Sequence, residues 1–404
     1  MSGSISLQRL RHIVEELLAN EGIMGEYDIH IKSGLEKGKN YIGEVTFFNI
    51  TPKETSKIYH LVMKTISTSD AVRKVMPLEC GFKRECYMYS KVFPTMKEFL
   101  TPFGDDVRMN YIPKFYSICE EYKNETLILE DLFHEGFLSW DRYKVLDMDH
   151  VLLVLKSLAE YHAISLAMSK KIPKDFEGLS RNLSNMLINF GNIEERAFFF
   201  KRVIQKVCGL LEKSNRKDLA EKIDMKIVRN VENLLLTETS DEDKVVISHG
   251  DCWNSNILFK YTSSTDFKPS EICFVDFQFC MLDTPVKDIS FFLYTSCDKS
   301  QLDKFDFLLQ TYYASFSKTL KSLECEPDKI FSYEDLLRHW KKYSAFGLVL
   351  SSFFIRIEQL LSGEVPEMNT QNPFDKIFEH DIKNEDIFRR RIMDVFTHYA
   401  ETFL

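Results

Sequence analysis

Two aspartates and an asparagine stand at the ends of short apolar runs in one segment of the chain. The run Val245-Val-Ile-Ser248 leads into His249-Gly-Asp251-Cys-Trp-Asn-Ser-Asn256, and Ile257-Leu-Phe-Lys-Tyr261 follows it. A third run, Ile272-Cys-Phe-Val275, leads directly into Asp276-Phe-Gln278. Short runs rich in β-branched and aromatic residues predict strands. The segment is therefore expected to fold as short strands whose ends hold polar side chains in tight loops, where active sites are commonly built.

The three polar residues at these strand ends match what phosphoryl transfer from Mg-ATP requires. The carboxylate of Asp251 could accept a hydrogen bond from a substrate hydroxyl and orient it toward the γ-phosphate. The side-chain oxygens of Asn256 and Asp276 could hold Mg²⁺, which needs only one or two protein ligands when phosphate oxygens complete its shell. Asp251 and Asn256 taken singly could be ordinary turn residues. The joint pattern instead predicts a catalytic set of Asp251, Asn256 and Asp276 and a metal site of Asn256 and Asp276.

Several short motifs in and around this segment are shared with one group of kinases. They are Cys252-Trp253 after H-G-D, Asn256-Ile-Leu-Phe, the D-F-Q of residues 276–278, Leu158-Ala-Glu-Tyr-His162-Ala and Asp288-Ile-Ser-Phe-Phe-Leu. On these motifs the chain resembles the aminoglycoside phosphotransferase and choline kinase superfamily, and within it the ecdysteroid kinase-like (CHK kinase-like) family. The likeness extends from about residue 25 to about residue 360 and is strongest between residues 245 and 295.

The order of the predicted elements indicates a two-lobed, protein-kinase-like α+β fold. The first third reads mainly as strands interrupted by one helix, with strands expected at 28–32, 41–50, 58–63, 114–121 and 126–129 and the helix at 82–93. From about residue 134 helices dominate, and they are expected behind a cap at Asp147 or Asp149, within 191–236 and 299–320, and over 333–361 behind the Ser332-x-x-Asp335 capping pattern. This order predicts a β-rich nucleotide-binding lobe of residues 1–131 and a mostly helical catalytic and acceptor-binding lobe of residues 132–404.

The resemblance implies further residues for nucleotide binding. Lys64 ends a predicted strand and matches the family's lysine that contacts the α- and β-phosphates, and Glu85 matches its helix glutamate partner. Either residue alone could be an ordinary exposed charge. The run Leu127-Ile-Leu-Glu130-Asp131-Leu132 looks like the connection between the lobes, where backbone groups near Glu130 and Leu132 would bind the adenine edge.

A glycine-containing segment between two predicted strands is the candidate phosphate loop. Gly38 and Gly43 could let backbone N–H groups approach the phosphates. The segment has neither a GxGxxG nor a Walker A pattern, so a plain hairpin turn is the alternative. In the related family a small polar residue often follows the loop, and Gly43 stands near that position.

Three further residues are expected to support the site without taking part in the chemistry. The superfamily likeness implies that Asp288 braces the catalytic loop, the segment from His249 to Asn256. Asp288 could also cap the helix that follows Asp288 itself. His162 is expected to be a satisfied core histidine of its helix. His249 is expected to support the catalytic turn, because phosphoryl transfer depends on positioning and charge neutralisation more than on proton relays.

Composition restricts the location and the partners of the chain. A net charge of −9 argues against nucleic-acid and anionic-membrane partners. The nine cysteines are scattered and lack zinc-binding spacing, which predicts free thiols in a reducing compartment. The N-terminus has no signal-peptide form, and the longest strongly apolar stretch, 345–355, is too short to span a membrane. We therefore expect a cytoplasmic protein without a membrane, nucleic-acid or obligate protein partner.

These observations together predict an ATP- and Mg²⁺-dependent kinase that phosphorylates a hydroxyl of a small molecule. The catalytic loop has no H-R-D arginine, no A-P-E motif follows D-F-Q, and the interval from Asp276 to Asp288 is too short for a regulated activation loop. A small alcohol is therefore favoured over a protein as the acceptor, and the enzyme is expected to need no phosphorylation switch.

The identity of the acceptor is only weakly indicated. The segment 340–361 holds several aromatic and apolar residues, most of which are expected to be core: Trp340, Tyr343, Phe346, Leu350, Phe353 and Phe354. Their number, with the family likeness, favours an apolar acceptor such as an ecdysteroid, another steroid or a secondary metabolite, although fold does not specify substrate. A choline or ethanolamine kinase and a non-catalytic nucleotide-binding protein are the alternatives.

Overall fold

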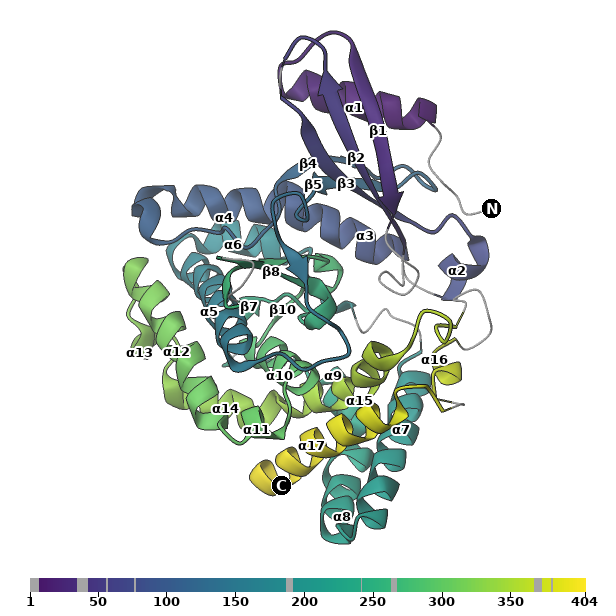
Figure 1. Ribbon diagram of the computed structural model, residues 1–404. Coiled ribbons are helices and arrows are strands. Elements are labelled where there is room, and N and C mark those ends of the chain that lie inside the picture. Colours follow the sequence, from purple (N-terminus) through teal and green to yellow (C-terminus); the bar gives the residue numbers. More distant parts are fainter. Residues whose placement is uncertain are drawn as a thin grey trace.

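The molecule has a sheet-based lobe and a mainly helical lobe (Figure 1). The computed structural model describes residues 7–34, 43–55, 57–75, 78–186, 192–240, 242–262, 267–366, 373–378 and 381–404. The sheet lobe contains the first third of the chain, and the small strands of the helical lobe lie on the side that faces the sheet lobe (Figure 1). This is the two-lobed α+β fold predicted from the sequence.

The first lobe is built on an antiparallel sheet. Its strand order is β1 (Tyr27–Gly34), β2 (Gly43–Pro52), β3 (Tyr59–Ile66), β5 (Thr126–Glu130) and β4 (Phe115–Cys119). Each strand matches one that was predicted, to within a few residues. The central strand β3 pairs Lys64 with Val45 on one side and with Leu127 on the other, so Lys64 has a fixed position on a strand that is hydrogen-bonded along both edges.

Helix α1 (Leu7–Asn20) covers one face of this sheet (Figure 1). Leu10, Val14 and Leu17 are buried and pack with strand residues that include Phe48 and Leu61. The prediction of a single helix in the first third was therefore wrong. The spacing of the apolar residues in α1 is helical, and strand residues such as Phe48 need a partner on that face because one side of a two-layer sheet must be buried.

The second helical segment of this lobe is longer than predicted. It consists of α2 (Asp70–Val75), α3 (Leu78–Tyr87), a π-helical turn (Met88–Val92), α4 (Phe93–Leu100) and a 3-10 turn (Thr101–Asp106). The predicted apolar face is buried. The ring centroids of Phe93 and Tyr89 lie 4.8 Å and 5.9 Å from the ring centroid of Phe277. These ring contacts tie the helix to the D-F-Q segment of the other lobe.

Short strands in the second lobe support the segment with the polar motif. One sheet has the order β6 (Leu138–Ser139), β8 (Ile257–Tyr261) and β9 (Pro269–Phe274), and β7 (Val246–Ile247) pairs with β10 (Leu282–Asp283). All these pairs are antiparallel. The predicted strands around the motif are therefore present.

Helices make up the rest of the second lobe. In chain order they are α5 (Met148–Lys171), α6 (Pro173–Ser180), α7 (Ile193–Lys213), α8 (Lys217–Lys226), α9 (Val231–Leu236), α10 (Pro285–Ser296), α11 (Lys299–Leu302), α12 (Phe305–Ser322), α13 (Pro327–Ile330), α14 (Tyr333–Tyr343), α15 (Ala345–Gln359), α16 (Pro373–Lys376) and α17 (Glu385–Phe403). Asp147 is the N-cap of α5, with its Oδ1 accepting from the His150 N–H at 3.0 Å. Ser332 and Asp335 form the predicted capping box of α14.

The helical region predicted over 333–361 consists of two helices, α14 and α15. Ser344 lies between them. Helix α15 packs closely on α10, and a Cβ on Gly347 would stand 2.4 Å from the backbone nitrogen of Phe291. Only glycine permits this approach, which brings α15 next to the helix that follows the polar motif.

Helix α5 lies at the centre of the second lobe. It is the one described helix that is long and apolar enough to cross a membrane, and 72% of its apolar window is buried inside the molecule. Its buried side chains include Leu155, Leu158 and His162. These features are those of a core helix.

The nine cysteines are all described, and none forms a disulfide, as predicted. Most are buried; Cys252 and Cys273, for example, are 0% and 1% exposed. Burial raises the pKa of both thiols well above the usual value. They therefore behave as small apolar side chains.

Candidate active site

The pairing of β8 with β9 brings Asn256 and Asp276 together. Ile257 begins β8 and lies opposite Phe274, which ends β9. Just beyond this pair, the backbone oxygen of Asn256 accepts a hydrogen bond from the Val275 N–H at 3.0 Å. The two predicted metal ligands are thus neighbours at the end of the strand pair, although strands β8 and β9 separate them in the sequence.

Asp251 and Asn256 are held together within the catalytic loop, and each is 7% exposed. The Asn256 Nδ2 donates to the Asp251 Oδ2 at 2.8 Å and to the Asp251 backbone oxygen at 2.9 Å. Because the amide nitrogen is engaged in this way, Oδ1 is the Asn256 atom left for other ligands. Burial, aided by the charge of Asp276, raises the pKa of Asp251 well above the usual value.

Asp276 occupies a left-handed backbone conformation, with φ of 66° and ψ of 62°. This region costs roughly 1–2 kcal/mol for a residue with a Cβ, and aspartate tolerates it better than most. The turn points the carboxylate toward the first lobe, where its Oδ1 lies 2.6 Å from the Lys64 Nζ. Strained residues of this kind cluster at active sites.

Lys64 links the two lobes through a double ion pair. Its Nζ lies 2.6 Å from the Glu85 Oε2 on α3 and 2.6 Å from the Asp276 Oδ1. Although burial opposes it, the two carboxylates raise the pKa of Lys64, so the ammonium is charged. Burial raises the pKa of Glu85, and the positive charge of Lys64 offsets this rise only in part. The predicted lysine–glutamate pair is therefore formed, and it includes the predicted metal ligand as a third member.

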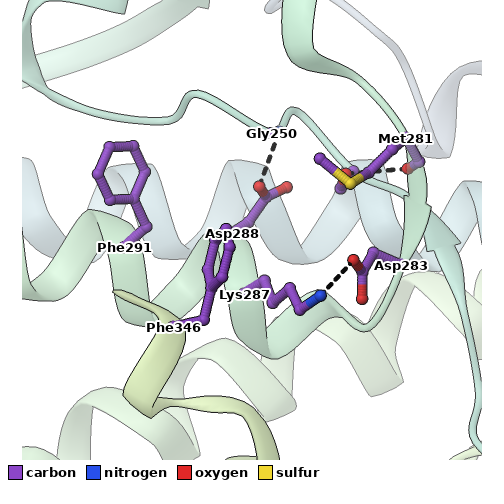
Figure 2. A pocket seen from close by; sticks show the side chains of 8 residues that line it. Gly250, Met281, Asp283, Lys287, Asp288, Phe291 and Phe346 are labelled. Carbon is purple, nitrogen blue, oxygen red and sulfur yellow. Dashed lines mark hydrogen bonds and ion pairs between the residues drawn. The ribbon is translucent and has the colours of Figure 1, made fainter. Parts of the chain in front are cut away.

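Asp288 braces the catalytic loop from below. Its Oδ2 accepts from the His249 N–H at 2.6 Å. Its Oδ1 accepts from the Gly250 N–H at 2.9 Å (Figure 2). The N-cap of α10 is Thr284, not Asp288. Of the two expectations for Asp288, the structure therefore shows the brace and not the helix cap.

His162 and His249 are both structural. His162 is fully buried, with Nδ1 2.8 Å from the Tyr312 hydroxyl and Nε2 3.1 Å from the Asp288 Oδ2. The His249 Nδ1 lies 3.2 Å from the Asp251 N–H and accepts its hydrogen bond. Burial lowers the pKa of His249, so a neutral ring supports the turn, as predicted.

Gly250 is required at the centre of the H-G-D turn. Its φ is 78°, and a Cβ there would lie 2.0 Å from the Phe279 backbone oxygen. No other residue fits both the conformation and the space. The glycine thus lets the catalytic loop pass directly over the D-F-Q turn.

Replacing Asp288 by asparagine is expected to lower kcat about ten- to a hundredfold, because small displacements of catalytic groups have effects of that size. The backbone N–H of either His249 or Gly250 would then face the NH₂ group of the new side chain. An unpaired buried donor costs about 1–3 kcal/mol of stability. Steady-state kinetics and a thermal melt would measure both effects. Asp298→Asn, which alters the N-cap of the remote helix α11, is the matched control. Equal kcat values for the two variants would contradict the bracing role.

The connection between the lobes is fixed by Asp131. Its Oδ1 accepts from the N–H groups of Phe133 and His134 at 3.1 and 3.2 Å, and its Oδ2 lies 3.3 Å from the Lys32 Nζ. Glu130 ends β5, where its side chain accepts from the Lys114 N–H. Neither residue reaches into the catalytic loop.

Leu132 belongs to a small apolar cluster at the connection. It is buried with Phe137, Leu258 and Cys273, and the partly buried Val275 packs against them. The cluster combines residues from the connection with residues of β8 and β9. It therefore forms an apolar floor where the connection meets β8 and β9.

The two predicted loop glycines have different outcomes. Gly38 lies outside the described residues. Gly43 begins β2 opposite Ile66, and a Cβ there would stand 2.0 Å from the Thr65 backbone oxygen. Close strand packing is thus sufficient reason for a glycine at 43, and its part in binding phosphate stays a prediction.

Arg84 is a buried contact between the lobes that the sequence did not indicate. Its Nη1 donates to the backbone oxygen of Cys280, after the D-F-Q turn, and to that of Ser184 at 3.0 Å. It lies next to Glu85 on α3, so it holds the same helix against the second lobe. Nothing in the local sequence distinguishes it from an exposed arginine, because its partners are backbone atoms distant in the chain.

The site combines a lysine–glutamate pair on the sheet lobe with an aspartate, an asparagine and a second aspartate on the helical lobe. Together with the fold, this defines a phosphotransferase of the protein-kinase-like class that acts on small molecules. A model of the ecdysteroid kinase-like family matches residues 37–325, and the chain belongs to this family. The comparison with curated proteins found no match.

Among solved structures, the GDP complex of wild-type aminoglycoside 2'-phosphotransferase-IIIa aligns with 99% of this chain and 100% of its own, with 12% sequence identity and a TM-score of 0.44. Glucosamine kinase in complex with glucosamine, ADP and inorganic phosphate aligns with 84% of this chain and 82% of its own, with 12% identity and a TM-score of 0.35. Both alignments are distant.

Proposed function

We propose that the protein transfers the γ-phosphate of ATP to a hydroxyl group of a small apolar molecule. The observation that carries this proposal is the meeting of Lys64, Glu85 and Asp276 in one ion-paired group beside the linked Asp251 and Asn256. We assign residues 1–131 to nucleotide binding and residues 132–404 to catalysis and acceptor binding.

Asp251 is the residue that would orient the acceptor hydroxyl. Its carboxylate is buried, and Asn256 fixes one of its oxygens. In this role it accepts the hydrogen bond of the hydroxyl and directs the hydroxyl oxygen at the phosphorus, which is the main contribution that a side chain can make to this reaction.

Asn256 and Asp276 fit a magnesium ion. Asn256 has a free amide oxygen, Asp276 has a carboxylate that is 22% exposed, and hard oxygen ligands are those that Mg²⁺ prefers. The described residues contain no group of three or more histidine, cysteine, aspartate or glutamate side chains placed for a metal. Phosphate oxygens would therefore have to complete the shell. The ion would neutralise charge on the phosphates.

The remaining nucleotide contacts follow from the position of Lys64. Its ammonium would contact the α- and β-phosphates while Glu85 keeps it in place. Backbone groups at Glu130 and Leu132 would bind the adenine edge above the apolar floor. Gly38 and Gly43 would border the phosphates.

An aromatic wall beside the catalytic loop favours an apolar acceptor. The Phe354 ring lies 4.9 Å from Trp253, which is two residues past Asp251, and 4.8 Å from Phe291 on α10. Most other aromatic residues of 340–361 are core: Trp340, for example, packs on Phe305. Phe354 is only partly buried, so it can present a ring face to a ligand.

The charges near this wall do not suit a cationic acceptor. Glu358, one helical turn past Phe354, is 1% exposed and ion-paired with Arg391. A small cavity between the catalytic loop and α10 is lined by Phe291, Phe346 and the ion pair of Lys287 with Asp283 (Figure 2). A choline-like cation needs an acidic or aromatic cage that is free to bind it, whereas Glu358 and Asp283 are already paired with cations.

A competition assay tests the proposed function. With Mg-ATP and equal concentrations of ecdysone, choline and dimethylbutanol, the uncharged carbon analogue of choline, we expect ecdysone to be phosphorylated fastest, because burial of apolar surface contributes about 25 cal/mol per Å². Asp251→Asn is the negative control. Preferential phosphorylation of choline would reject the apolar acceptor and leave the kinase assignment. Binding of Mg-ATP without phosphorylation of any alcohol in a wider panel would favour the non-catalytic alternative.

We further propose that the protein acts in the cytoplasm on a diffusing alcohol, without a nucleic-acid, membrane or obligate protein partner. The net charge of −9 supports this proposal. So do the unbridged cysteines, because disulfides are rare in reducing compartments.

A further inference from the structure

We propose that Trp253 positions Asp251: its indole N–H donates a hydrogen bond to the Asp251 carboxylate when the enzyme carries its substrates. This inference deepens the proposed function and rests on it. It assigns a task to the indole N–H of Trp253, which the roles given above leave unused.

The backbone of the catalytic loop holds Trp253 close to Asp251. The backbone N–H of Trp253 donates to the Asp251 backbone oxygen at 3.1 Å. The backbone oxygen of Trp253 accepts from the backbone N–H of Asn256 at 2.9 Å. A 3-10 turn follows at Asn254–Asn256. Asp251, Trp253 and Asn256 are therefore fixed relative to one another within one hydrogen-bonded turn.

The indole N–H lacks a partner although it is buried. Trp253 is 6% exposed, and its Nε1 has no acceptor at hydrogen-bonding geometry. Buried tryptophan N–H groups usually have a partner, and an unpaired one costs about 1–3 kcal/mol. The Trp253 side chain also acts on Asp251 as a donor that lowers its pKa, opposing the larger effect of burial. The acceptor that suits this donor is therefore the adjacent carboxylate.

The Asp251 carboxylate has room for this donor. An ionised carboxylate offers about four lone-pair sites on two oxygens. The Asn256 Nδ2 occupies a site on Oδ2. A donor from Trp253 would hold the group from a second direction and still leave a lone pair for the acceptor hydroxyl. With two donors the carboxylate cannot rotate freely about its Cβ–Cγ bond.

The Trp253 ring is itself held in place. It meets Phe354 edge to face, at 4.9 Å and an interplanar angle of 74°, and Phe354 meets Phe291 in the same way at 4.8 Å and 79°. Aromatic pairs of this geometry contribute about 0.5–1.5 kcal/mol each. A substrate bound against the exposed part of Phe354 would thus contact the ring that packs on Trp253, the residue that orients Asp251.

Trp340 is a matched control within the same chain. It is also buried, at 2% exposure, and its Nε1 also lacks a partner. Its ring contacts are Tyr294, Phe305 and Phe403, none of which belongs to the catalytic loop. Trp253→Phe and Trp340→Phe each remove one buried N–H group and retain an aromatic ring.

The hydrogen bond can be observed directly, without turnover. The chain has three tryptophans, so isotope-labelled protein gives three indole N–H resonances, and Trp253→Phe identifies the one of interest. In the presence of ADP, Mg²⁺ and ecdysone, Asp251→Asn is expected to move the Trp253 resonance upfield, because the bond to a charged acceptor is lost. The Trp340 resonance should stay in place. An unmoved Trp253 resonance would overturn the inference.

Kinetics provides the second test. Trp253→Phe is expected to lower kcat about ten- to a hundredfold, with the KM for ATP unchanged, whereas Trp340→Phe leaves both values unchanged. A thermal melt of each variant excludes unfolding as the cause. Equal kcat values for the Trp253→Phe variant and the wild type would also overturn the inference. If the wild-type protein phosphorylates no alcohol, the proposed function fails instead, and the resonance measurement still reports on the contact of Trp253 with Asp251.

Discussion

Replacing Asp251 by asparagine is expected to lower kcat by about a hundred- to ten-thousandfold, the range lost with a group that handles the reacting proton. The amide keeps the shape of the carboxylate, and its oxygen can still accept from the Asn256 Nδ2 that now lies at 2.8 Å. It cannot carry the negative charge that attracts the acceptor hydroxyl. Nucleotide binding should persist, because Lys64, Glu85 and Asp276 are unchanged and one negative charge near the phosphates is removed.

Single-turnover kinetics, together with the thermal shift caused by ATP and Mg²⁺, would separate these two effects. The Asn254→Asp variant, which changes the amide to an acid three residues away, controls for altered charge in the loop. A rate above about one tenth of the wild-type value in Asp251→Asn would exclude Asp251 as the orienting base.

Replacing Asp276 by alanine should impair binding as well as turnover. The change removes the only carboxylate among the two proposed metal ligands. It also removes one of the two partners of Lys64, which would remain paired with Glu85 at 2.6 Å. A ligand present at a hundred times its Kd stabilises the native protein by about 2.7 kcal/mol, and most of that stabilisation by Mg-ATP should be lost.

Thermal melts with ATP alone, Mg²⁺ alone and both together would measure this loss. Asp303→Ala, which breaks the exposed ion pair of Asp303 with Lys299, is the control. A shift with Mg-ATP that equals the wild-type shift would exclude Asp276 from the metal site.

The elements that the sequence predicted well are those fixed by local rules. The strands around Asp251 and Asp276, the cap at Asp147 and the capping box at Ser332 depend on residues a few positions apart. Helix α1 obeys the same rules, since Leu10, Val14 and Leu17 recur at helical spacing. It was missed although its signal is local, and not because tertiary contacts hide it.

Other features could not be predicted because they join distant parts of the chain. Lys64 and Asp276 are 212 residues apart, and Arg84 reaches a backbone oxygen 196 residues away. Asp288 shows the limit in a different way: Thr284 and Asp288 both suit the start of a helix, and only the folded loop reveals that Asp288 faces the His249 and Gly250 N–H groups. Spacing along the chain says which residues are present, whereas long-range packing decides which of them meet.

In the free protein, the Lys64 ammonium of the double ion pair would compete with a divalent cation for the Asp276 carboxylate. A tethered ammonium 2.6 Å from Asp276 acts as a counter-ion at high effective concentration, so a divalent cation arriving alone would have to displace it. Nucleotide phosphates would draw the ammonium away and supply the missing oxygen ligands in the same event. The metal and the nucleotide would then bind with positive coupling, and by reciprocity each would raise the affinity of the other by the same factor. A site built in this way would discriminate against stray cations and would assemble its charge only when the phosphate donor is in place.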